Sequence, residues 1–421
     1  MGSELQKNYS QGRFEESVPN DFDLQAKLAT CQSYNVPENS VTGDESLPYQ
    51  TALYGNSGAL VDWLHETGVG FMTMGAPYGT TCVLAPGMYM GGCGYTMGYL
   101  ADRVVALGGE LDYHTVATSL IQADDGTVTG VEAEDRDGST FSINASAVCL
   151  CTGGFAANQD LVAQYYPQYA DFTFNCCKGS TGAGLQMALD AGAYTECMGR
   201  DLGAFNSVTP DAAGTRFEVA FLAQFAGGLM VNDKGDEFGK GRLSHAFMAS
   251  AITNPDNGGR FFHVTDHAGA IKLQKMDTWA CTDYAALFDR GDIVHYDTVQ
   301  EAAEELGLPD LSETIDSHNR HALAGEEDEF GRTPGFLNIN DGIWVVSCMP
   351  TFYLTTGGIG IDTAGHVLTD GGASTISGLY AAGDIAGSIE EKDGNMYGYG
   401  FDSALTYGFI MANTIITEQA K

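Results

Sequence analysis

Basic residues are scarce in this chain of 421 residues, in which 19 Lys and Arg stand against 55 Asp and Glu and the formal net charge is −36. Such an acidic surface repels phosphate backbones and anionic lipid headgroups, which argues against nucleic acids and membrane surfaces as partners. It also disfavours a broadly basic pocket of the kind that dicarboxylates need, although a few buried Arg could supply one. The simplest role of this charge is to keep the protein soluble.

Long apolar runs are absent as well. No stretch of 18 apolar residues occurs, so the sequence predicts no membrane-spanning helix. Residues 1–23 are polar and lack the apolar centre of a signal peptide. The sequence as written therefore favours a cytoplasmic protein, and export stays open if an N-terminal segment is missing.

Familiar metal and hydrolase motifs are also lacking. The ten Cys show no zinc or iron–sulfur spacing, and no P-loop, HExxH or Ser-His-Asp signature occurs. Cys149 and Cys151 stand two apart in an apolar run, where strand alternation places both side chains on one face, which we expect to be buried. The sequence therefore predicts reduced thiols in the core and no metal site.

Glycine, in contrast, is abundant, with 55 residues, and apolar residues make up 44% of the chain. The apolar content predicts a folded core rather than disorder. Many glycines suit tight turns and backbone that packs close to a ligand, as in α/β nucleotide-binding folds. Hydrophobic periodicity and turn signals predict the following elements. Helices are expected at 58–68, 95–107, 184–191, 243–252, 299–306 and 402–418, and strands at 110–114, 116–121, 128–134, 140–143, 147–151, 227–231, 358–362, 365–368 and 378–382.

The order of these elements predicts a discontinuous α/β domain. Residues 1–156 and 346–421 have strand-and-turn texture, whereas residues 157–345 are mostly helices with long connections. We therefore expect the first and last parts to form one nucleotide-binding domain of the Rossmann type, with an α+β segment inserted between them. A cleft and relative movement between the two parts are expected with it.

Two strand-to-glycine motifs point to chemistry. The strand predicted at 147–151 runs into Thr152, Gly153 and Gly154, and the strand predicted at 378–382 runs into Gly383 and Asp384. Glycine at the carboxyl end of a parallel strand lets the backbone approach a cofactor closely. Each motif alone could be an ordinary strand that ends in a turn, but two of them in one chain are more specific.

These blocks resemble the superfamily of FAD-dependent fumarate reductases, urocanate reductases and 3-oxosteroid dehydrogenases. The resemblance covers about residues 55–421 and includes residues 180–184, 227–232, 356–358 and 403–408 in addition to the two motifs. It implies an FAD-binding domain with an inserted cap. It also implies an FAD-dependent oxidoreductase that transfers a hydride between the flavin and a carbon–carbon double bond conjugated to a carbonyl, in an enone or enoate that includes steroid-like ones.

The resemblance also implies a set of cofactor-binding residues and an electron partner of unknown identity. In many flavoproteins an acid at the position of Asp384 bonds the ribityl chain of FAD. The residues assigned to the cofactor are Ala117, Thr152, Gly153, Gly154, Leu354, Gly383, Asp384, Gly400 and Phe401.

The chain departs from the family pattern at several positions. No GxGxxG, which binds the FAD pyrophosphate in the family, precedes Gly58, and Ala183 replaces a family Asp. We therefore expect that residues 1–48 do not form the dinucleotide-binding βαβ unit. A truncated homologue or subunit that binds no FAD by itself is the alternative function. The substrate-clamping Arg expected near Asn395 is absent, which favours a less charged substrate than fumarate.

Catalytic groups follow from the same resemblance. An ungapped count from Phe238 places His245 where the fumarate reductases keep the Arg that donates a proton, and imidazole is a competent proton donor near neutral pH. The alternative is a surface or capping His on the helix predicted at 243–252. Tyr353, Tyr397 and Tyr399 resemble the tyrosines that polarise the ketone in 3-oxosteroid dehydrogenases. Their alternative role is packing in the core.

Overall fold

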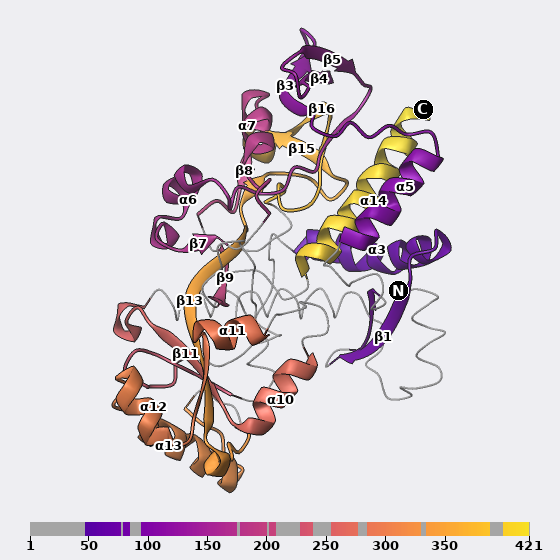
Figure 1. Cartoon of the computed structure of the whole chain (residues 1–421). Helices are drawn as coiled ribbons and strands as arrows, with labels where there is room; N and C mark the ends of the chain where they lie inside the picture. Colours follow the sequence, from indigo (N-terminus) through magenta and orange to yellow (C-terminus); the bar gives the residue numbers. More distant parts are fainter. Residues whose placement is uncertain are drawn as a thin grey trace.

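The computed structural model describes residues 47–76, 79–84, 94–174, 177–199, 202–207, 228–238, 254–276, 284–329, 334–387 and 399–420. These residues form a mixed α/β fold with two apolar cores. One long strand, β13 (Ile343–Thr355), begins in a sheet with flanking helices at one core and ends in the other core (Figure 1). The predictions at 243–252, His245 and Tyr397 lie outside the described residues, as does almost all of 1–48.

The first core surrounds a small sheet of three strands in the order β15 (His366–Thr369), β16 (Ser374–Ala381) and β6 (Val148–Leu150). β16 pairs with β15 antiparallel and with β6 parallel. Buried side chains of this core include Leu150, Val162, Leu185, Phe352, Leu379, Ile385, Tyr407 and Met411. Residues as far as 261 positions apart, such as Leu150 and Met411, thus share one interior.

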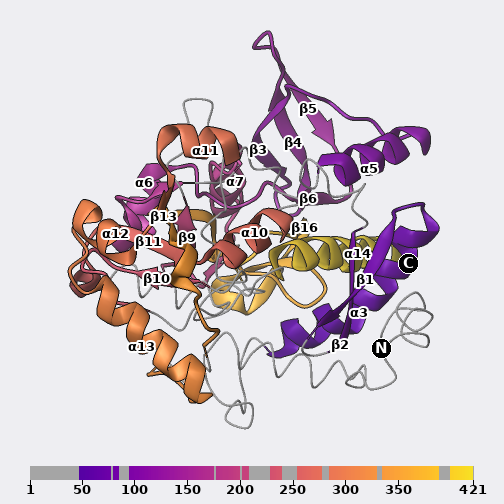
Figure 2. The same ribbon diagram turned by 60° about the horizontal axis from the view of Figure 1, so that its bottom comes forward.

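An antiparallel meander packs against this core and projects from the molecule (Figure 2). It consists of β3 (Val116–Gln122), β4 (Val128–Glu134) and β5 (Thr140–Asn144). The Asp135 carboxylate accepts the N–H groups of Asp137 and Ser139 at 3.1 and 3.0 Å and closes the turn between β4 and β5. The strands expected at 116–121, 128–134 and 140–143 are confirmed, and short-range turn chemistry favours their pairing as hairpins.

Three helices pack beside the first core: α3 (Leu47–Glu66), α5 (Gly94–Ala106) and α14 (Tyr399–Gln419). Leu60 and Leu64 of α3 are buried against side chains of the other two. α3 begins eleven residues before the predicted start, because tertiary contacts support its first turns: Leu53 is fully buried, and the Tyr49 hydroxyl donates to the Ile361 carbonyl at 2.8 Å. A further hairpin consists of β1 (Phe71–Ala76) and β2 (Gly79–Leu84).

Two sequence expectations are wrong in this part of the chain. Residues 110–114 form no strand; they are exposed, and His114 has a φ of 61°, which interrupts an extended backbone. Cys149 in β6 and Cys151 just past its end are both exposed rather than buried. Within the described residues β6 is an edge strand, and alternation alone could not tell which of its faces is covered. Desolvation by neighbouring atoms and the nearby Cys151 raise the pKa of Cys149 to about 11, so the thiol form prevails.

The second core lies on a larger sheet. β13 pairs antiparallel with β11 (Phe261–Thr265) on one side and β12 (Ile293–Tyr296) on the other, and β10 (Leu229–Val231) pairs with β11. Toward its end, β13 pairs with β9 (Leu202–Ser207) and β7 (Thr173–Phe174). Helices α12 (Val299–Leu306) and α13 (Leu311–Ala324) bury one face. Trp344 points to the other, toward α10 (His267–Met276) and α11 (Tyr284–Arg290).

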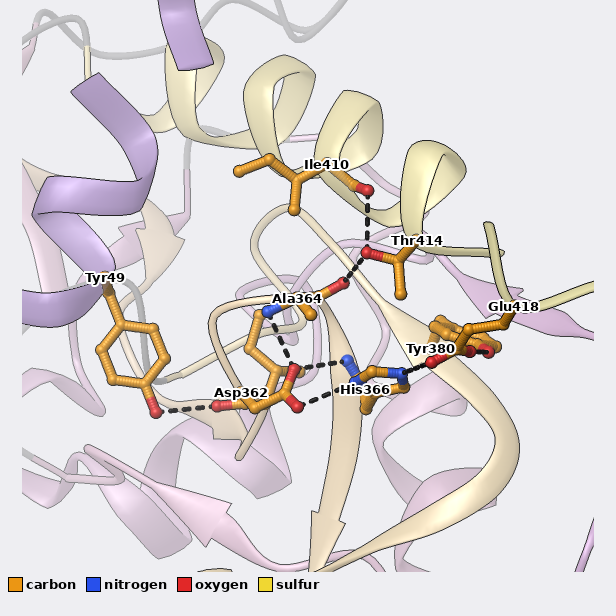
Figure 3. A network of polar contacts seen from close by, with 9 residues as sticks. Tyr49, Asp362, Ala364, His366, Tyr380, Ile410, Thr414 and Glu418 are labelled. Carbon is orange, nitrogen blue, oxygen red and sulfur yellow. Dashed lines mark hydrogen bonds and ion pairs between the residues drawn. The ribbon is translucent and has the colours of Figure 1, made fainter. Parts of the chain in front are cut away.

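The position of α14 is fixed by a network of polar contacts (Figure 3). The His366 ring contacts the Asp362 carboxylate through Nδ1 at 2.8 Å and the Glu418 carboxylate of α14 through Nε2 at 3.0 Å. The Tyr380 hydroxyl donates to the same Glu418 at 2.6 Å, and the Thr414 hydroxyl donates to the Ala364 carbonyl at 3.1 Å. No helix in the described part of the chain combines the length and apolarity needed to cross a membrane.

Candidate functional site

The two strand-to-glycine motifs lie side by side. Parallel pairing sets Ala381 of β16 opposite Leu150 of β6, and the Ala382 N–H donates to the Leu150 carbonyl at 3.2 Å. Both strands therefore end at the same edge, where residues 152–154 follow β6 and residues 383–384 follow β16. Gly383 has a φ of +81°, a conformation that a side chain would strain, and this turns the chain away from the strand.

A third segment reaches the same place from β13. A Cβ added to Gly154 would overlap the Thr355 hydroxyl and would lie 3.5 Å from the Asp384 carbonyl oxygen. The backbone at Gly154 is therefore pressed between segments that are about 200 and 230 positions away. Only glycine allows this approach, which explains the residue type at this point of the motif.

A fourth segment completes the arrangement at the start of α7 (Ala183–Asp190). The Gly182 N–H donates to the Gly154 carbonyl at 3.2 Å, and a Cβ on Gly184 would overlap the Thr152 side chain. We refer to residues 152–154, 180–184, 355–358 and 383–384 together as the glycine junction. Sequence reasoning identified all four segments, and the structure brings them into contact.

Two buried hydrogen bonds connect segments of the junction. The Phe155 N–H donates to the Thr355 hydroxyl at 3.2 Å, and the Gly357 N–H donates to the Tyr166 hydroxyl at 3.1 Å. Tyr166 follows α6 (Gln159–Tyr165) and is fully buried. Directly after Gly357 comes β14 (Gly358–Ile359), which pairs with β8 (Thr195–Glu196). The Ile359 N–H donates to the Ile385 carbonyl at 2.8 Å.

Asp384 supplies the acidic group of the junction. It is half-buried, and in the described part of the chain no hydrogen bond to its carboxylate is found. Burial raises the pKa of this carboxyl above its usual range. A half-buried carboxylate is suited to accept hydrogen bonds from ligand hydroxyls. With glycine backbone packed around it, the junction fits a cofactor that carries hydroxyl groups, as FAD does.

The remaining sequence-predicted residues fall into three groups. Leu354 is buried beside Thr355, and Ala117 is half-buried in β3 against the first core. The backbone of Tyr353 lies in β13, and Tyr399, Gly400 and Phe401 begin α14, but these side chains lie outside the described residues, as do His245 and Tyr397. The roles of all these residues stay predictions. Sequence reasoning missed Thr355, which adjoins a recognised motif, and Tyr166, which no pattern marks.

Comparison with known proteins places these features in a family. The profile of the family described as the FAD binding domain matches residues 38–393. A probable fumarate reductase of Shewanella frigidimarina is 27% identical over 273 residues, covering 64% of this chain and 44% of the relative. A vinyl phenol reductase of Lactiplantibacillus plantarum is 27% identical over 393 residues, covering 84% of this chain and 78% of the relative.

The fold likewise has a counterpart among solved structures. The open conformation of a flavocytochrome c3 fumarate reductase superposes with a TM-score of 0.72 at 22% identity, covering 99% of this chain and 70% of that one. At this identity the likeness concerns the fold alone. The chain spans less than half the length of several curated relatives that it matches, with shares of 44%, 31% and 35% in three of them.

Proposed function

Because this chain belongs to the FAD binding domain family, we propose that it is an FAD-dependent reductase of carbon–carbon double bonds that are conjugated to a carbonyl. Family membership supports the cofactor, and the names of similar proteins support the reaction class, since they include a fumarate reductase, an acrylate oxidoreductase and a urocanate reductase. The whole protein's activity is part of the proposal, because the chain spans only part of those relatives.

One observation carries the proposal: the convergence of the glycine junction around Asp384. Four segments spread over more than 230 positions meet where β6 and β16 end, and an added Cβ would overlap neighbouring atoms at Gly154, Gly184, Gly357 and Gly358. Such a junction costs conformational entropy, because glycine loses more backbone freedom on folding than other residues. A cofactor that binds against this backbone would explain why glycine occupies these positions despite that entropic cost.

We further infer a discontinuous FAD-binding domain built from residues 1–156 and 346–421, with residues 157–345 as an inserted α+β cap. The sheet on which α12 and α13 pack belongs to the inserted part, apart from residues 346–355 of β13. The cap would close over the substrate and exclude water from the hydride transfer.

The reaction requires a hydride and a proton. FAD, when bound and reduced, supplies the hydride. Addition of a hydride to one alkene carbon leaves an enolate, and we propose that His245 donates the proton to the other carbon. Tyr353, Tyr397 and Tyr399 would polarise the substrate carbonyl through their hydroxyls, so that the developing negative charge on oxygen is stabilised. The electron donor that reduces the flavin is a partner whose identity the sequence leaves open.

We propose a substrate with less negative charge than fumarate. The Arg that would clamp a second carboxylate is absent near Asn395, and the chain as a whole carries a net charge of −36. Uncharged enones and monocarboxylic enoates are therefore the substrates to test first.

FAD uptake by the purified chain tests the proposal. We expect a yellow protein that retains about one FAD per chain and shows flavin absorption near about 450 nm. Anaerobic reduction followed by addition of an enone should restore this absorption, with one saturated product formed per flavin reoxidised. A chain that stays colourless after incubation with FAD would contradict the proposal and favour the alternative, a homologue or subunit that binds no FAD by itself.

A further inference from the structure

The hydroxyl of Tyr166 is directed at one backbone group of the glycine junction. The Tyr166 side chain is fully buried, and its oxygen accepts the Gly357 N–H at 3.1 Å across 191 positions of sequence. The ring is held between Phe155 and Tyr169, with centroid distances of 5.9 and 6.5 Å. A ring packed on both sides keeps its hydroxyl in one place, so the contact is specific rather than incidental.

Gly357 itself has little freedom to move away from this contact. A Cβ on Gly357 would lie 2.7 Å from Met198 Cα and 2.8 Å from the Cys197 carbonyl oxygen, so the turn is pressed against that backbone on its other side. A buried N–H that loses its acceptor cannot turn to solvent without displacing the turn. The Tyr166 hydroxyl therefore holds the Gly357 backbone in its place.

A second hydrogen bond joins the same two regions of the chain. The Phe155 N–H donates to the Thr355 hydroxyl at 3.2 Å, and both of these groups are buried. Residues 155–166 thus hold residues 355–357 at two points, one at each end of this short turn. Two bonds fix both the position and the orientation of one segment relative to the other, which a single bond would not do.

We propose that Tyr166 is a positioning residue for FAD: it holds the 355–358 turn against residues 152–155, so that the glycine junction is preformed before the cofactor binds. This inference rests on the proposed function. Without the hydroxyl, the buried Gly357 N–H would lack a partner and the turn would relax. Cofactor binding would then have to order the turn again, and this ordering would reduce affinity.

The test compares two tyrosine hydroxyls in the full-length chain. Tyr166→Phe removes the hydroxyl at the junction. The matched control, Tyr49→Phe, removes a hydroxyl that also bonds a distant backbone group, the Ile361 carbonyl 312 positions away, but outside the junction. Three quantities are measured for each variant: the FAD dissociation constant by flavin fluorescence, amide hydrogen exchange of the peptide containing residues 355–358, and the thermal unfolding midpoint.

We expect both variants to lose some thermal stability, since Tyr166→Phe loses a buried hydroxyl bond and Tyr49→Phe a partly buried one. Only Tyr166→Phe should weaken FAD binding, on the order of 10-fold, and speed exchange in residues 355–358 by a similar factor. Thr355→Val should act like Tyr166→Phe and provides a second probe if that variant does not fold.

Equal FAD affinities for the two tyrosine variants would overturn the inference and leave Tyr166 a purely structural role. Unchanged exchange in residues 355–358 would overturn it as well. A wild-type chain that takes up no FAD would instead contradict the proposed function, so the two failures are distinguishable.

Discussion

The two ends of β13 are packed against different kinds of atoms. Near its start, Ile343 and Val345 are buried among large apolar side chains such as Leu311 and Ile315 of α13. Just past its end, Thr355 and the glycines of residues 357–358 contact backbone, with no room for an added Cβ. The first region is stabilised by apolar area removed from water, whereas the second is defined by close backbone approach and by hydrogen bonds to buried hydroxyls.

This difference has a consequence for function. A core of large side chains loses stability in proportion to the atoms removed, and the rest of the molecule keeps its shape. A junction of backbone segments tolerates no added atoms, because each contact is already at its limit. We therefore expect substitutions at the junction to affect FAD binding and stability together, and substitutions in the larger sheet to affect stability alone.

The largest effect is expected from Gly154→Ala. The added methyl group would overlap the buried Thr355 hydroxyl, so one of the junction segments must move. We expect a loss of about 3–5 kcal/mol in the free energy of unfolding and no measurable FAD binding, as judged by denaturant titration and flavin fluorescence. The control is Gly98→Ala in α5, where no atom lies within 4 Å of the added group. It should be neutral or slightly stabilising.

The next effect concerns the larger sheet. Leu311 is fully buried between α13 and the sheet, and Leu311→Ala should lower the free energy of unfolding by about 3 kcal/mol. FAD affinity per folded molecule should stay within about twofold of the wild type. Leu323→Ala, at a position of α13 that is 75% exposed, is the control and should change neither quantity. A large loss of FAD affinity in Leu311→Ala would remove the distinction between the two regions.

A smaller effect is expected at the start of α12. The Thr298 hydroxyl accepts the Glu301 N–H at 3.1 Å and caps the helix. Thr298→Ala should cost about 1 kcal/mol of unfolding free energy, because this N–H would lose its partner. Thr298→Ser retains the hydroxyl and should retain most of the stability. FAD binding should be unaffected in both variants, which extends the comparison to a helix beside the larger sheet, where the contact is polar rather than apolar.

The smallest effect concerns the His366 network that holds α14 beside the first core (Figure 3). Burial alone would lower the pKa of His366, but hydrogen bonds and charges from Asp362 and Glu418 outweigh it and raise the pKa. Protonated His366 therefore stabilises the fold below the unfolded pKa of about 6.5, and this contribution is lost as pH rises through the folded pKa.

His366→Gln should remove this pH dependence. Because these side chains are partly exposed, we expect the wild type to lose no more than about 1 kcal/mol relative to the variant between about pH 6 and pH 8. Parallel unfolding curves for the two proteins across this range would show that the network does not titrate. The junction contains no such ionised pair among its described residues, so FAD affinity should not follow this transition.

The sequence alone determined the local elements. The strands of the meander and the bounds of α12 followed from alternation, turn residues and hydrophobic periodicity, all of which act within a few positions. Two segments of the junction, residues 152–154 and 383–384, were recognised as strands that end in glycine, which is a local pattern, whereas the other two were recognised through the resemblance to a family. The local features depend on short-range physics, which a single stretch of sequence carries in full.

Only the tertiary structure decided which groups meet. The role of Tyr166, the early start of α3 and the exposure of Cys149 and Cys151 depend on segments far away in sequence or on a face that nothing in the described chain covers. Alternation places two side chains on one face of a strand, but burial depends on what packs there. Likewise, a tyrosine pattern does not reveal that one hydroxyl ends 3.1 Å from a glycine N–H that is 191 positions away, because that proximity is produced by the packing of the whole chain.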